Sequence, residues 1–204
     1  MATQSVYNEA LRGDLSTGDI VLFSGKGGIS TGIKWATVSK WSHVGMILKL
    51  EEYDFITVWE STTLSSIEDL DTKTSRQGVQ LVPLSSRVEK YSGEISIRKL
   101  TGVVLAQDHV KALMALRREI SGRPYEKSKL ELAKAAYDGP GGSNAEDLSS
   151  LFCSELVAEA YQRLGLLSDK KPSNEYTPAD FSEKRDLKLI RGSLSKEILI
   201  KKET

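Results

Sequence analysis

The chain has 204 residues, of which 39% are hydrophobic and 27% charged, a globular composition that excludes a disordered or low-complexity chain. Its 28 basic and 28 acidic side chains cancel, and without a basic excess we expect no nucleic-acid partner. No stretch approaches the ~20 apolar residues that span a bilayer. The first residues do not resemble a secretory signal. We therefore expect a cytoplasmic protein with a single domain over residues 1–204.

Strand-like runs gather in the first half of the chain. A short helix is expected at residues 4–11, a longer one at 29–40, and a polar surface loop at 61–77. Apolar runs bounded by glycine or polar residues predict five strands, at 19–23, 43–50, 53–60, 78–84 and 94–100. The second and third strands are joined tightly at Glu51-Glu52, which predicts a hairpin. Because this pair suits a two-residue turn poorly, we expect a four-residue loop with the same centre.

Helical periodicity dominates after residue 100. It predicts helices at 105–120, 125–137 and 152–165, with a glycine-rich loop at 138–144 before the last of them. Gly165 is the expected C-cap of that helix, and Ser149 or Ser150 its N-cap. Short strands at 187–191 and 198–201 close the chain. Clustered strands flanked by helices favour an α+β fold over alternating βαβ units.

Cys153 is the only cysteine, so no intramolecular disulfide can form. We place it in the first turn of the helix expected at 152–165, where unpaired N–H groups and the helix dipole stabilise a thiolate and can hold an oxyanion. The residues at i+3, i+4 and i+7 are apolar, so the side chain faces inward, as a buried structural cysteine also would. Its place at a helix start after a glycine-rich loop favours a nucleophile.

His43 is the candidate base, and Glu60 is its candidate partner. If the hairpin is centred between Glu51 and Glu52, His43 lies directly opposite Glu60, with Cβ atoms ~4.5–5.5 Å apart. A carboxylate there would fix the imidazole tautomer and leave the second ring nitrogen free to act as a base. A bulge or an odd-length turn would instead put Glu60 on the other face.

His109 is the alternative base, because the chain has only two histidines. It lies early in the helix expected at 105–120, near the apolar face, where a histidine needs no function. Nothing in the surrounding sequence orients it as a base requires. With one cysteine and two histidines, a zinc site is not expected.

Several short motifs follow one another along the chain in an order typical of one superfamily. They are Gly18-Asp19, Ser42-His-Val-Gly45, Val58-Trp-Glu60, Gly122-Arg-Pro-Tyr125 and Phe152-Cys-Ser-Glu-Leu-Val157. The set resembles the circularly permuted branch of the NlpC-type papain-like cysteine hydrolases, the YiiX-like group, which is distantly related to lecithin–retinol acyltransferase. The resemblance runs from about residue 18 to residue 180, and no family pattern aligns with residues 126–151.

The resemblance implies a permuted papain-like fold, with a small, mostly antiparallel β-barrel or sheet packed on the nucleophile helix. By motif position, Cys153 would be the nucleophile, His43 the base and Glu60 the residue that orients His43. Tyr125 and Ser154 would line the substrate or oxyanion site. No cofactor or metal is expected.

Three functions remain open at this point. The first is a thiol hydrolase that cleaves an amide or related acyl bond through an acyl-enzyme. The second is a lipid acyl hydrolase or acyltransferase with the same triad, which would need an apolar surface for peripheral contact with a membrane. The third is a non-catalytic papain-like shell that binds a small ligand. The partner is accordingly a small-molecule, peptide or lipid-like acyl substrate, and the oligomeric state is left open.

Overall fold

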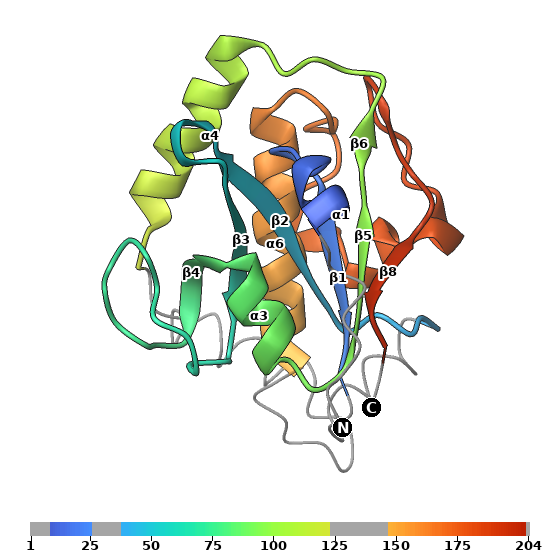
Figure 1. The fold of residues 1–204 in the computed structure, drawn as a ribbon. Coiled ribbons are helices and arrows are strands. Elements are labelled where there is room, and N and C mark those ends of the chain that lie inside the picture. Colours follow the sequence, from blue (N-terminus) through green and yellow to red (C-terminus); the bar gives the residue numbers. More distant parts are fainter. Residues whose placement is uncertain (1–8, 26–37, 123–146, 203–204) are drawn as a thin grey trace.

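A six-stranded antiparallel sheet forms the centre of the computed structural model, which describes residues 9–25, 38–122 and 147–202 (Figure 1). The strand order is β4-β3-β2-β1-β5-β8, so each of β1 to β3 lies beside its neighbour in the chain. The strands are β1 (Ile20–Ser24), β2 (His43–Leu50), β3 (Phe55–Thr62), β4 (Gly78–Pro83), β5 (Glu94–Arg98) and β8 (Ile198–Lys201). In the described part of the chain the sheet stays open, with edges at β4 and β8, and forms no closed barrel.

The alternation of side chains along the strands separates two apolar clusters. Ile20, Val44 and Trp59 point to the face covered by α4 (Gln107–Ile120) and α6 (Asp147–Arg163). Phe23 and Val58 point to the other face, where α3 (Leu84–Lys90) packs. Figure 1 shows α6 and α3 on opposite sides of the sheet. Because both faces are covered, the central strands read as nearly continuous apolar runs.

The hairpin of β2 and β3 has a different register from the one expected. Met46 lies opposite Trp59 and Leu50 opposite Phe55, so the prediction that His43 lies directly opposite Glu60 is wrong by two residues. The connection consists of a 3₁₀ turn, Glu51–Tyr53, and Asp54, which adopts a left-handed conformation with φ 44°. This moves the centre of the hairpin by one residue and the pairing by two, which keeps both side chains on the same face.

Two predicted helices are present with shifted starts. The helix expected at 105–120 begins at Gln107, and the one expected at 152–165 begins at Asp147. Cys153 is therefore the seventh residue of α6, and its placement in the first turn is wrong. Serines cap helices well but cost only a few tenths of a kcal/mol inside one, so Ser149 and Ser150 did not mark the boundary.

The C-terminal end of α6 agrees with the sequence. Gly165 has φ +65°, its N–H donates to the carbonyl of Gln162, and the N–H of Leu166 donates to the carbonyl of Tyr161. These two bonds are the Schellman pattern expected when glycine follows the last helical turn.

Other expectations fail or lie outside the described residues. The strand expected at 78–84 ends at Pro83, and α3, where no helix was predicted, begins at Leu84. Residues 38–40 are not helical, and residues 187–191 form no strand. The helix expected at 125–137 lies outside the described residues. So do most residues of the helices expected at 4–11 and 29–40. Within the described ranges, the remaining elements are the short helix α1 (Glu9–Gly13), the strands β6 (Leu100–Thr101) and β7 (Ser193–Leu194), and the 3₁₀ turns η1 (Glu51–Tyr53), η2 (Ser173–Glu175), η3 (Pro178–Phe181) and η4 (Glu183–Arg185).

Across the described ranges, no helix is both long and apolar enough to cross a membrane.

Candidate active site

His43 and Glu60 form a buried pair near one end of the sheet. His43 is the first residue of β2, and Glu60 lies in the second half of β3. The Nε2 atom of His43 is 2.6 Å from Oε2 of Glu60, and the two side chains are 12% and 0% exposed. The shifted register makes them diagonal neighbours rather than direct ones, a separation that a long side chain can span.

Gly45 provides the space that this diagonal contact needs. The register of the hairpin places it beside Glu60, between β1 and β3. A Cβ atom at Gly45 would lie 2.7 Å from Cγ2 of Val58 and 3.3 Å from Cβ of Glu60. A larger residue at this position would therefore clash with Val58 and crowd the Cβ atom of Glu60.

The second oxygen of Glu60 is held by an arginine. Both Nε and Nη2 of Arg87 lie 2.6 Å from Oε1 of Glu60. Arg87 Nη2 also donates to Oε1 of Gln80 at 3.2 Å. Gln80 is paired with Glu60 across β3 and β4, and its amide nitrogen donates to the carbonyls of Leu64 and Arg76. The carboxylate of Glu60 is therefore fixed by charged or hydrogen-bonded partners at both oxygens.

Cys153 is the second hydrogen-bond partner of the His43 imidazole. α6 packs across β2 and β3, and the buried Cys153 side chain forms a hydrogen bond with His43. Since Glu60 engages Nε2, Nδ1 is the ring nitrogen that remains for the sulfur. The structure thus brings Cys153, His43 and Glu60 together in one chain of contacts.

The charges of these neighbours determine the protonation of His43. Burial acts to lower its pKa, but the negative charges of Cys153 and Glu60 and the hydrogen bonds to both outweigh burial and raise the pKa to about 9. For Glu60, burial acts to raise the pKa, while Arg87 and His43 together hold it below its ordinary value. An imidazolium between two anions is the arrangement that stabilises a thiolate.

We expect His43 in the folded protein to titrate at about pH 9, well above the ordinary histidine value of 6.5. The extra proton bound by the folded state between these values means that its stabilising contribution is complete below pH 6.5 and is lost as the pH rises through about 9. Because the chain has only two histidines, NMR titration of ¹⁵N-labelled imidazoles can follow each of them, with His109→Gln to assign the signals. A value for His43 at or below 6.5 would contradict the ion-pair description.

A second layer of aromatic side chains packs behind His43. The ring of Phe23, paired with His43 across β1 and β2, lies 5.1 Å from the imidazole, and Tyr91 stands edge-on to Phe23 at 5.0 Å. The Tyr91 hydroxyl bonds to the side chain of Ser42, and burial raises the pKa of this phenol. These contacts restrict the rotation of the imidazole ring.

Of the other candidate residues, the structure describes Ser154 and His109. Ser154 is buried, and its hydroxyl donates to the carbonyl of Tyr176 at 2.6 Å. Tyr125 lies outside the described residues. His109 is near the opposite end of α6, where Arg191 Nη2 lies 3.3 Å from its Nδ1 and also donates to the carbonyl of Leu164. Cys153 precedes that end of α6 by about 15 Å along the helix axis, so the structure does not bring His109 to the thiol.

Sequence reasoning missed Arg87, Gln80 and Tyr91. The available signal was weak: Arg87 follows Leu84 by three residues and precedes Val88, so it shares the apolar face of a short helix. A cation on such a face is a candidate for a buried ion pair, because an unpaired buried charge is very costly.

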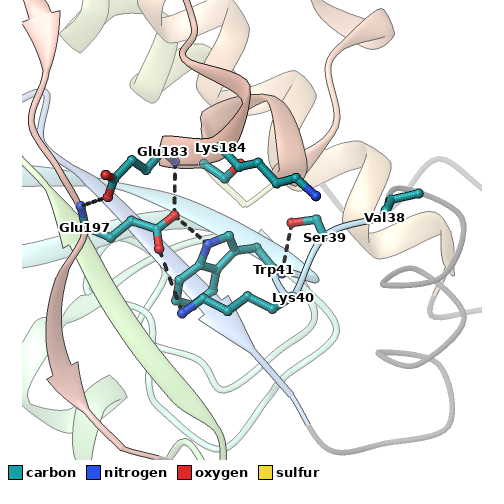
Figure 2. A pocket seen from close by; sticks show the side chains of 8 residues that line it. Val38, Ser39, Lys40, Trp41, Glu183, Lys184 and Glu197 are labelled. Carbon is teal, nitrogen blue, oxygen red and sulfur yellow. Dashed lines mark hydrogen bonds and ion pairs between the residues drawn. The ribbon is translucent and has the colours of Figure 1, made fainter.

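A separate surface pocket lies beside Trp41, between residues 38–41, residues 182–184 and Glu197 (Figure 2). Glu197 accepts hydrogen bonds from Nε1 of Trp41 at 2.7 Å and from the backbone N–H of Glu183 at 3.0 Å. Lys40 pairs with Glu94 at 2.6 Å and with Glu197 at 3.8 Å. The main polar groups of this pocket therefore form hydrogen bonds and ion pairs with one another.

Among the described side chains, no three His, Cys, Asp or Glu residues gather as metal ligands would.

Comparisons with known proteins give a likeness at the level of structure. No family model and no curated protein matches the chain. Among solved structures, the chain is similar to a protein described as metalloprotein yiiX from Escherichia coli O157:H7. The two are 19% identical with a TM-score of 0.48, over 92% of this chain and 97% of the other.

Proposed function

We propose that this protein is a cysteine hydrolase that cleaves an amide or a related acyl bond, with Cys153 as nucleophile, His43 as acid and base, and Glu60 as the residue that orients His43. The observation that carries the proposal is the contact of 2.6 Å between His43 and Glu60, with Cys153 hydrogen-bonded to the same imidazole. Nucleophile, base and orienting acid in one hydrogen-bonded series are the signature of covalent acyl transfer.

The reaction that suits these groups has two halves. The sulfur of Cys153 attacks the carbonyl carbon, and the electron pair of the C=O bond moves to the oxygen. The C–N or C–O bond then breaks as His43 gives its proton to the leaving group, which leaves a thioester on Cys153. In the second half, His43 takes a proton from water, the hydroxide attacks the thioester, and the released thiolate recovers its imidazolium partner.

A purely structural role explains this cluster less well. Glu60 and Arg87 are 0% and 1% exposed, and buried ion pairs are often no more stable than well-packed apolar residues of similar volume. The cluster also includes the only cysteine of the chain and a histidine with a strongly raised pKa. Perturbed ionisable groups that converge on a nucleophile are typical of active sites.

The position of Cys153 changes which group must activate it. Two turns inside α6, the cysteine lies beyond the first turn, to which the effect of the helix dipole is confined. The proposal therefore assigns thiolate stabilisation to His43. Since Cys153 is buried and the imidazole is 12% exposed, a substrate would approach from the side of His43.

The experiment that tests the proposal labels the protein with small electrophiles and then measures turnover. Iodoacetamide, a peptidyl chloromethyl ketone and a fatty-acyl chloromethyl ketone are applied at pH 7, and the modified residue is mapped by mass spectrometry. We expect modification at Cys153, and hydrolysis of amide or thioester substrates that Cys153→Ala abolishes. A Cys153→Ala variant that retains full hydrolysis would refute the proposal. Selective turnover of phospholipids would favour the lipid acyl reaction, and binding without turnover of any acyl substrate would favour the ligand-binding shell.

A further inference from the structure

We infer that Arg87 is a positioning residue of the proposed reaction: its guanidinium holds one oxygen of Glu60, so that the other oxygen is presented to His43. This inference rests on the proposed function. The side-chain hydrogen bonds of Arg87 go to Glu60 and Gln80, and we assign it no direct part in the chemistry.

The two carboxylate oxygens of Glu60 have different partners. Oε1 receives both Nε and Nη2 of Arg87 at 2.6 Å, whereas Oε2 contacts Nε2 of His43 at 2.6 Å. A carboxylate held by two donors at one oxygen has little freedom to rotate, because both donors belong to one planar group. Arg87 thus sets the direction from which Glu60 meets the imidazole.

Arg87 is itself held by α3 and its surroundings. Gln80 accepts from Nη2 of Arg87 at 3.2 Å. At the C-terminal end of α3, the buried amine of Lys201 donates to the carbonyls of Val88 at 2.6 Å, Glu89 at 3.2 Å and Tyr91. A cation bonded to the last carbonyls stabilises a helix end. α3 is therefore a fixed support for Arg87.

The positive charge of Arg87 also affects the net charge of the site. In the thiolate–imidazolium form that the proposed reaction requires, Cys153, His43 and Glu60 together carry one net negative charge, which the guanidinium of Arg87 balances. The ionisable groups that face Glu60 are His43 from β2, Arg87 from α3, Tyr91 after α3 and, through His43, Cys153 from α6. Without Arg87 the cluster would carry a net negative charge, and it would take up a proton at a higher pH.

A second buried arginine, Arg98, offers a matched control. It is 3% exposed, and its guanidinium donates to the backbone carbonyls of Ser195, Phe181 and Leu194 at 2.7 to 3.1 Å. These three hydrogen bonds all go to backbone carbonyl oxygens and none to Glu60, so Arg98 supports the fold away from the site. A general loss of structure would affect Arg98→Met and Arg87→Met alike.

The experiment records the rate of Cys153 alkylation and of turnover between pH 4.5 and 9, normalised to titrated active sites. We expect Arg87→Met to move the acid limb of both profiles upward by about one pH unit or more, which is at least a tenfold loss of rate on that limb. Arg87→Lys keeps a charge near Glu60 and should restore the limb to the wild-type position. Arg98→Met should leave it there. An Arg87→Met limb that coincides with the wild-type limb, or an equal shift in Arg98→Met, would overturn the inference.

A double variant keeps the inference testable if Arg87→Met does not fold. Glu60→Gln combined with Arg87→Met removes both buried charges. If Arg87 acts through Glu60, the double variant should match Glu60→Gln alone within about threefold, because coupled residues are not additive. A much larger loss would show that Arg87 acts by another route. His43→Ala serves as the reference for the proposed function: if it leaves Cys153 reactivity unchanged, the proposed function fails, whereas a failure limited to the Arg87 variants overturns the inference alone.

Discussion

Replacing His43 with alanine is expected to slow the alkylation of Cys153 by iodoacetamide at pH 6 about 100-fold. An ordinary cysteine has a pKa of ~8.5, so only ~0.3% of it is thiolate at pH 6. In the folded protein the imidazolium of His43, with its pKa raised to about 9, remains protonated at this pH beside the sulfur. The ratio of the wild-type alkylation rate to that of His43→Ala should be smaller than the ratio of their thiolate fractions, because a stabilised thiolate is also a weaker nucleophile.

The pH dependence should separate this effect from a loss of packing. In wild type the alkylation rate should change little between pH 6 and 8, whereas in His43→Ala it should rise about tenfold per unit over the same range. The matched control is His109→Ala, which removes the other histidine, near the opposite end of α6. Equal profiles for wild type and His43→Ala would show that the imidazole does not activate Cys153.

The sequence predicted the layout of the site better than its details. The strand that begins at His43, the next strand with Glu60 and the inward-facing Cys153 all follow from local apolar periodicity. The hairpin register did not follow, because it depends on where the four-residue connection is centred: Asp54 tolerates a left-handed conformation, which moves the centre one residue later than expected. A register error of two residues leaves every side chain on its original face of the sheet. The contact between His43 and Glu60 was therefore predicted correctly from a register that is wrong.

The start of α6 and the presence of α3 were harder to predict. Serine is neutral enough inside a helix that it marks a boundary only when other signals agree. α3 has only seven residues and follows Pro83 at the end of β4, and such a short helix is stable only through its packing. Arg87 is therefore placed by tertiary contacts with Glu60 and Gln80 that no local pattern contains.

Replacing Arg87 with methionine should also lower the free energy of unfolding at pH 7 by about 3–5 kcal/mol, since removing one partner of a buried ion pair leaves the other charge uncompensated. Glu60, 0% exposed, would keep only His43 as a charged partner. Urea denaturation gives the measurement, and Arg163→Met is the comparison, because Arg163 pairs with Glu159 on the surface at 2.9 Å. That exposed pair should contribute no more than about 1 kcal/mol.

The pH dependence of the free energy of unfolding distinguishes an unpaired buried charge on Glu60 from a simple loss of packing at residue 87. In wild type the low pKa of Glu60 gives stability that is present above its ordinary value of 4.5 and is lost as the pH falls through the lower folded value. In Arg87→Met, burial without the guanidinium favours the protonated carboxyl, so the deficit relative to wild type should shrink between pH 7 and pH 5. The double variant Glu60→Gln, Arg87→Met should recover most of the loss at pH 7, because neither charge is then buried alone. A double variant as unstable as Arg87→Met would mean that the methionine itself, and not the carboxylate, causes the loss.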